Sequence, residues 1–128
     1  MIRIFDTEPV APVGADGSAV ASATVGPING EIVGIYVKYD SAQAATIDTN
    51  IATAHEPVKS ILALTNSKTS GWYHPQAQLC DPSGTPLTFD GTHPIVDEIC
   101  VSDYVTVSWA QADNTHPVRA YILVEQEG

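Results

Sequence analysis

The chain has 128 residues, and its 15 carboxylates against five lysines and arginines give a formal charge of −10. A surface this acidic repels nucleic-acid phosphates and anionic membranes, which excludes both as expected partners. One domain of this size can bury a sufficient core without metals or disulfides, and no apolar run reaches the ~20 residues of a membrane-spanning helix.

The first 29 residues differ in composition from the rest, being built largely of Pro, Gly, Ala, Ser and Val. Pro9 and Pro12 break any helix and interrupt the hydrogen bonding of a sheet. Three large apolar residues precede them and predict a short strand or an anchor: Ile2, Ile4 and Phe5. We expect residues 1–29 to form an extended N-terminal arm that lies on a neighbouring subunit, or an edge strand. A poorly packed leader is the alternative, and the opening ten residues do not resemble a secretion signal.

The next stretch, GEIVGIYVKYD at 30–40, predicts the central strand of a domain that spans residues 30–128. Side chains of a strand alternate between its two faces, and β-branched and aromatic residues favour this structure. We expect the odd-numbered face to build the core, through Val33, Ile35, Val37 and Tyr39.

The middle of the chain predicts several shorter strands. Residues 46–53 alternate, with Ile47, Thr49 and Ile51 on one face and polar residues on the other. Residues 60–66 are apolar on both faces, which indicates an internal strand. Residues 72–80 alternate around Pro75, and that proline indicates an edge strand or a bulge. Turn sequences then bracket a short return strand: DPSG at 81–84, TPLTF at 85–89 and DG at 90–91.

Two well-patterned strands close the chain. Residues 103–110 place Val105, Val107 and Trp109 on one face, and residues 118–125 place four apolar residues on one face: Val118, Ala120, Ile122 and Val124. Residues 94–101 alternate more loosely. We count eight or nine strands with short connections, no amphipathic helix, and therefore an all-β fold. An antiparallel, jelly-roll-like β-sandwich is favoured over a closed barrel.

Residue types that carry chemistry show no catalytic spacing. Four histidines are far apart, and His74, His93 and His116 each precede a proline, which places them in loops or at strand ends. The chain has no HExxH, GxSxG or phosphate-binding glycine motif. We therefore expect no enzyme, no metal and no cofactor. Cys80 and Cys100 do not form a CxxC pair, and we expect free thiols rather than a disulfide.

The two tryptophans receive different predictions. Trp109 shares the face of Val105 and Val107, which favours the core. Trp72 follows a glycine and opposes the face of Tyr73, so we expect it to be exposed or at an interface. Exposed aromatic residues on a β-sandwich stack on sugars or fill a pocket of a partner protein.

Several stretches together resemble a family of small tailed-phage proteins that are encoded with the head genes and decorate the capsid. Beside GEIVGIYVKYD, the distinctive stretches are LTNSKTSGWYHP at 64–75, the DPSG turn, and DYVTVSWAQA at 103–112. The likeness spans about residues 30–125, and the first 29 residues lie outside it.

The resemblance implies a structural virion protein on the capsid exterior, made in the bacterial host cytoplasm. Its implied partner is the major capsid protein, and its implied form is a homotrimer. The alternative is a carbohydrate- or receptor-binding module on a virion that uses Trp72 and Tyr73. We expect capsid or subunit contacts from Ile2, Ile4, Phe5, Pro9, Pro12, Trp72 and Tyr73.

Overall fold

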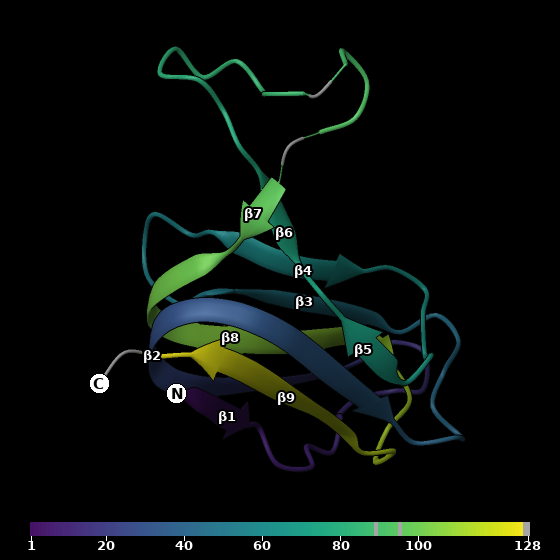
Figure 1. The fold of residues 1–128 in the computed structure, drawn as a ribbon. Helices are drawn as coiled ribbons and strands as arrows, with labels where there is room; N and C mark the ends of the chain where they lie inside the picture. The colour runs from purple at the N-terminus through teal and green to yellow at the C-terminus, as the bar shows by residue number, and fades with distance from the viewer. Residues whose placement is uncertain (89, 95, 127–128) are drawn as a thin grey trace.

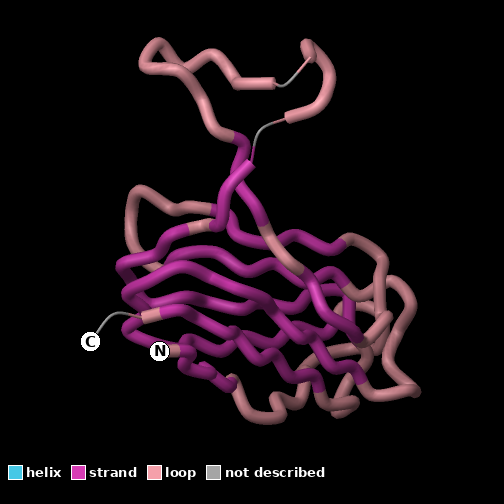
Figure 2. Tube along the Cα trace, in the orientation of Figure 1, coloured by secondary structure: helices cyan, strands magenta, loops and turns pink. Residues whose placement is uncertain are grey.

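The computed structural model describes residues 1–88, 90–94 and 96–126, and these contain no helix (Figure 2). Every strand pairing among them is antiparallel, so the predicted all-β antiparallel class is confirmed. The strands of this part of the chain are β1 (Ile2–Asp6), β2 (Ala19–Tyr39), β3 (Asp48–Thr53), β4 (Ser60–Leu64), β5 (Gly71–Tyr73), β6 (Gln76–Gln78), β7 (Val96–Glu98), β8 (Cys100–Ala112) and β9 (Val118–Glu125).

Seven of these strands form one sheet, in the order β1-β9-β2-β8-β3-β4, with β5 paired to β2 beside this path. β6 and β7 form a separate two-stranded sheet. Figure 1 shows that this pair and the loop it carries project away from the other strands.

The long strand β2 connects both parts of the large sheet. Its first part, Ala19 to Glu31, pairs with β8, and its second part, Glu31 to Tyr39, pairs with β9. The strand continues across residues 29 and 30, where the composition of the sequence changes. Pro27 fits within it because the register with β8 shifts between Val25 and Ile28, and a bulge does not require the hydrogen bond that proline lacks.

One hydrophobic core joins the inner faces of these strands. The faces predicted for the last two strands are confirmed, since Val105, Val107 and Trp109 are at most 1% exposed, and so are the four apolar residues predicted for the core face of β9. Each fully buried side chain of this kind stabilises the fold by about 1.5–3 kcal/mol relative to an exposed one. The other fully buried large residues are Ile28, Ile32, Ile35, Val37, Ile47, Ile51, Ile122 and Val118.

The prediction for the 30–40 stretch is wrong at its start. Ile35, Val37 and Tyr39 are buried as expected, but Val33 is only half-buried, and Ile32 is fully buried in its place. The register between β2 and β9 shifts between Ile32 and Gly34. This bulge adds one residue to β2 and so reverses which parity faces the core.

The first eighteen residues are ordered by contacts with the rest of their own chain. β1 pairs with β9, and Val10 forms an isolated bridge with Val118. The Thr115 amide donates a 2.9 Å hydrogen bond to the Pro12 carbonyl. The segment therefore lies along one side of the large sheet, with β1 at its edge.

Candidate binding surfaces

A patch of exposed and half-buried apolar side chains crosses four strands on the outer side of the large sheet. We call it the aromatic face, and its residues line one hollow of about 300 Å³: Ile4, Tyr36, Trp72, Tyr121 and Leu123. Ile4 is 59% exposed and Trp72 is 54% exposed. Contiguous apolar patches on an otherwise polar surface mark sites of interaction.

Strand register builds this face from distant parts of the chain. Tyr36 of β2 lies opposite Trp72 of β5 on one side and Tyr121 of β9 on the other. Ile4 of β1 lies opposite Leu123 of β9. Residues directly opposite in an antiparallel pair point to the same face, which brings the five side chains together.

The aromatic rings are inclined to one another and do not form a flat surface. The Tyr36 and Trp72 ring centroids are 5.2 Å apart with an interplanar angle of 67°. Tyr36 and Tyr121 are 6.2 Å apart at 58°. Ring edges meet ring faces, as the quadrupoles of aromatic rings prefer. The result is a walled hollow suited to an apolar side chain.

One end of the aromatic face carries charged side chains of both signs. The Arg119 guanidinium lies 4.8 Å from the Tyr121 ring centroid and donates two hydrogen bonds to the Asp6 carboxylate. These bonds lower the pKa of Asp6, although partial burial opposes the shift. Lys38 lies opposite Arg119 in the β2–β9 ladder and is exposed. The Glu8 carboxylate also lies near Arg119, so two cations, Lys38 and Arg119, and two carboxylates, Asp6 and Glu8, meet at this end.

The second candidate surface, which we call the N-terminal edge, is the outer edge of β1 and the chain around it. The Thr7 amide donates to the Ala120 carbonyl, and the Gln126 amide donates to the Met1 carbonyl. In an antiparallel ladder bonded and non-bonded residues alternate, so the amides of Ile2 and Ile4 point away from β9. Three exposed apolar residues accompany these outward groups, at 74%, 49% and 59% exposure: Met1, Ile2 and Ile4.

The third candidate surface is residues 76–98, which we call the projecting arm. β6 and β7 pair over three residues, and two isolated bridges beyond them link Cys80 with Pro86 and Thr88 with Pro94. The arm holds four carboxylates and no lysine or arginine. Three of its large apolar residues are 37–40% exposed: Leu79, Leu87 and Val96. The arm is therefore acidic and partly apolar at its surface.

Asp81 organises the first turn of the arm. Its Oδ1 accepts hydrogen bonds from the Ser83 hydroxyl and amide at 2.7 and 2.9 Å, and from the Thr85 amide at 3.0 Å. These bonds, that of the Ser83 hydroxyl above all, lower the pKa of Asp81. Such local side-chain to backbone bonds replace the packing that a core would supply.

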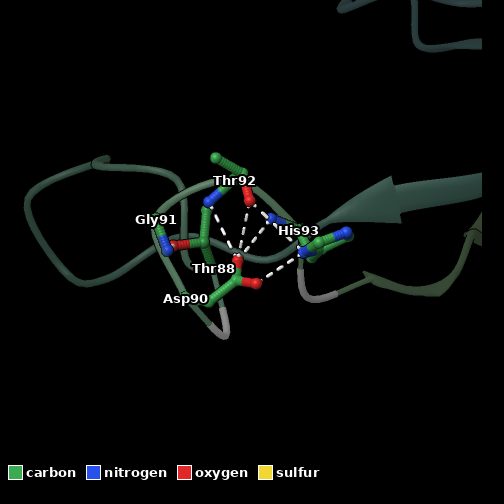
Figure 3. Close-up of polar contacts among 5 residues, drawn as sticks. All are labelled: Thr88, Asp90, Gly91, Thr92 and His93. Carbon is green, nitrogen blue, oxygen red and sulfur yellow. Dashed lines mark hydrogen bonds and ion pairs between the residues drawn. The ribbon is translucent and has the colours of Figure 1, made fainter.

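Asp90 organises the second turn in the same way (Figure 3). Its Oδ1 accepts the His93 amide at 2.8 Å and the Thr92 amide at 3.0 Å, and its Oδ2 lies 2.6 Å from the His93 Nδ1. The amides of His93 and Thr92, in that order, hold the pKa of Asp90 well below its usual range. The Gly91 amide donates to the Thr88 hydroxyl at 2.9 Å.

Three carboxylates meet where the arm joins the sheet. A hydrogen bond shared with the Glu31 carboxyl, partial burial and repulsion from neighbouring acids including Glu125 raise the pKa of Glu98. Glu31 lies opposite Glu125 in the β2–β9 ladder. The base of the arm is thus anionic, at the end of the sheet opposite to Lys38.

The predicted contact residues divide into exposed and buried ones. Ile2, Ile4 and Trp72 are exposed, and the structure places Ile4 and Trp72 in one hollow. Pro9 is also exposed.

The other three turn toward the protein. Phe5 is 7% exposed and belongs to the core, where the Arg3 guanidinium lies 4.7 Å from its ring centroid. Pro12 is buried, and Tyr73 packs partly against the core while its hydroxyl donates to the Thr69 carbonyl. Sequence reasoning missed Tyr36, Tyr121 and Leu123, whose only signal is apolar character on the strand face opposite to the core.

The histidines take part in local structure. His55 Nδ1 lies 2.6 Å from Asp103 Oδ1, and the His55 amide donates to the other oxygen of the same carboxylate. The side-chain bond from His55 is the main cause that lowers the pKa of Asp103. Within the described ranges, no three His, Cys, Asp or Glu side chains converge in a way that could hold a metal ion. Cys80 and Cys100 are both exposed and form no disulfide with one another.

Comparisons with protein-family models, with curated proteins and with solved structures find no match to this chain. Among the described residues, no helix has the length and apolar character needed to cross a membrane.

Proposed function

We propose that this chain is a structural virion protein that binds the outside of a phage capsid and stabilises it without catalysing a reaction. The proposed partner is the major capsid protein, and the proposed acting form is a homotrimer on the capsid exterior. The stretches at 64–75 and 103–112 support this through their resemblance to capsid decoration proteins. The acidic surface also suits docking on a basic shell.

The N-terminal edge is the observation that carries the proposal. A free strand edge with outward amides binds an extended segment of a partner by adding it to the sheet. The exposed Met1 and Ile2 supply apolar contacts beside these backbone groups. Soluble proteins usually protect such edges with charge or proline, since exposed ones associate. β1 carries Arg3 and Asp6 beside the exposed Ile2 and Ile4, and such a partly apolar edge suits a protein whose work is attachment.

Attachment alone stabilises a shell. A protein that binds the assembled shell and not the separate subunits shifts the equilibrium towards assembly by mass action. Several copies held together strengthen this effect, because one bound copy raises the effective concentration of the others.

We further propose that the large sheet is a jelly-roll-like β-sandwich whose two layers share β2. The first part of β2 pairs with β8 and the second part with β9 and β5. Buried residues of both parts belong to the same core, as two layers around one core require.

The aromatic hollow favours a second candidate function, a carbohydrate-binding module on a virion. Trp72 supplies an exposed ring for this role, whereas Tyr73 does not line the hollow. The inclination of the rings disfavours stacking on a flat sugar surface. Binding of the wild-type protein on a glycan array, lost in Trp72→Ala, is the result this candidate predicts.

Cosedimentation with shells assembled from the major capsid protein of the same genome tests the main proposal. We expect wild type to pellet with the shells and Ile2→Pro to bind about tenfold more weakly, because proline removes an outward amide and not a β1–β9 bond. Ile2→Val is the matched control and should bind like wild type. Wild-type protein that stays in the supernatant would refute the function, and normal binding by Ile2→Pro would refute the role of the edge.

A further inference from the structure

We propose that β1 exchanges between copies of this chain, so that β1 of one copy pairs with β9 of the next copy. This inference deepens the proposed homotrimer and in that sense rests on the proposed function. Exchange leaves the outer edge of β1 free, so it is compatible with the contact proposed between that edge and the shell. It assigns the contact between copies to a strand pairing that the structure already contains.

The binding site for an exchanged strand is the edge of β9. β1 pairs with β9 along all five of its residues and lies at the edge of the large sheet (Figure 1). Phe5 of this strand belongs to the core, and Asp6 accepts two hydrogen bonds from the Arg119 guanidinium. An identical strand from a second copy makes the same contacts, because copies of one chain carry the same β9.

β1 is separable from the rest of the sheet. Among the described residues it pairs with one strand, β9, and it has one buried residue, Phe5. The chain beyond it is anchored independently, since Val10 and Val118 exchange two backbone hydrogen bonds of 2.8 and 2.9 Å. Residues 7–9, between the strand and this anchor, are therefore the hinge for exchange.

The hinge is strained in its bent form. Glu8 has a φ of 60°, in the left-handed region that residues with a Cβ rarely adopt. Pro9 follows it directly, and a residue that precedes proline favours an extended backbone. Short, strained hinges promote exchange, because an extended hinge releases the strain while the exchanged strand keeps its other contacts.

Two local hydrogen bonds hold the bend. The Glu8 amide donates to Asp6 Oδ1 at 2.8 Å, and the Thr7 hydroxyl donates to the Glu8 carbonyl at 3.0 Å. Both bonds lie at the exposed surface, where water replaces a lost partner at a small net cost. They do not offset the preference of the Glu8-Pro9 pair for an extended backbone.

The length of the hinge determines how the copies are arranged. Three extended residues span roughly 10 Å, so the accepting β9 lies directly beside the copy that gives the strand. When each copy gives its strand to one neighbour and receives a strand from another, the contact is heterologous and closes as a ring. A ring of three copies is the proposed homotrimer.

A disulfide reports which copy supplies the strand. Ile4 lies opposite Leu123 in a pair without mutual backbone bonds, where the Cα atoms are close enough for a disulfide. In a background with Cys80→Ser and Cys100→Ser, the variant Ile4→Cys/Leu123→Cys links different chains in the exchanged form. In the closed form it links one chain to itself. Denaturing electrophoresis without reductant separates the two products, and no shell is present.

Thr24→Cys/Thr106→Cys in the same background is the matched control. Thr24 of β2 lies opposite Thr106 of β8 with the hydroxyls 3.2 Å apart, and exchange of β1 does not alter this pairing. We expect the control to run as single chains and the β1–β9 variant to run as linked trimers. Links confined to single chains in the β1–β9 variant would overturn the exchange.

Two substitutions of Glu8 shift the balance in opposite directions while removing the same charge. Glu8→Gly relieves the bent hinge, because glycine adopts positive φ freely, and it should weaken self-association about tenfold. Glu8→Val places a β-branched residue there and should strengthen self-association by a similar factor. Light scattering after size exclusion measures the mass of each variant across a range of concentrations, and circular dichroism verifies folding.

A wild type that is monomeric at every concentration would overturn the exchange, as would masses that do not respond to either Glu8 variant. Each of these outcomes leaves shell cosedimentation to be judged separately. A closed monomer that pellets with shells would refute the exchange and keep the proposed function. Linked trimers that stay in the supernatant would support the exchange and refute the function.

Discussion

The hydroxyl groups of Tyr39 and Thr49 hydrogen-bond to each other inside the core. Thr49 is 1% exposed and Tyr39 is 6% exposed. Burial of the phenol raises the pKa of Tyr39 to about 12. The pair joins the second part of β2 to β3, and it is a polar link within an apolar interior.

Breaking this link should destabilise the fold. Thr49→Val leaves the Tyr39 hydroxyl buried without this partner, and we expect the free energy of unfolding to fall by about 1–3 kcal/mol. Tyr39→Phe should have an effect of similar size for the reciprocal reason. Urea denaturation measures both. The double variant should lose clearly less than the sum, and strict additivity would show that the two hydroxyls do not interact.

At the scale of elements, sequence pattern predicts regular strands well and bulged ones poorly. Burial alternates without interruption over residues 103–110 of β8 and along β9, and the predicted core faces are confirmed. β2 contains register shifts near Pro27 and Val33, and the second of these reversed the predicted parity. A bulge depends on how the neighbouring strand is aligned, and one strand's own residues do not encode that alignment.

The residues of the candidate surfaces were also predicted only in part. Trp72 and Ile4 were predicted as contact residues, and both are exposed. Phe5 was expected at a surface and is buried, since β1 turns that side toward the core. Tyr36 and Tyr121 join the face only because β2 and β9 pair in this register.

The turns of the projecting arm should behave as independent local units. Asp90→Ala removes the acceptor for the amides of Thr92 and His93, and hydrogen exchange at these amides should accelerate about tenfold. Mass spectrometry of peptides from the arm measures the change. The thermal midpoint should stay close to that of wild type, because the arm lies outside the core.

Asp81→Ala is the reciprocal control for this experiment. It should accelerate exchange at Ser83 and Thr85 and leave Thr92 and His93 unchanged. Loss of protection across the whole arm in either variant would show that the two turns form one cooperative unit.

At the scale of the whole molecule, distinct surfaces surround one core. The N-terminal edge offers backbone groups, the aromatic face offers an apolar hollow, and the arm offers acidic and apolar side chains. This division suits a protein that contacts several neighbours at once, and the formal charge of −10 opposes non-specific association of copies.

Imaging of shells by electron cryo-microscopy, with and without the purified protein, tests the central claim most directly. The account predicts added density on the shell exterior, with the outer edge of β1 against a capsid subunit. Identical maps with and without the protein would contradict the account, as would bound protein whose β1 edge faces away from the shell.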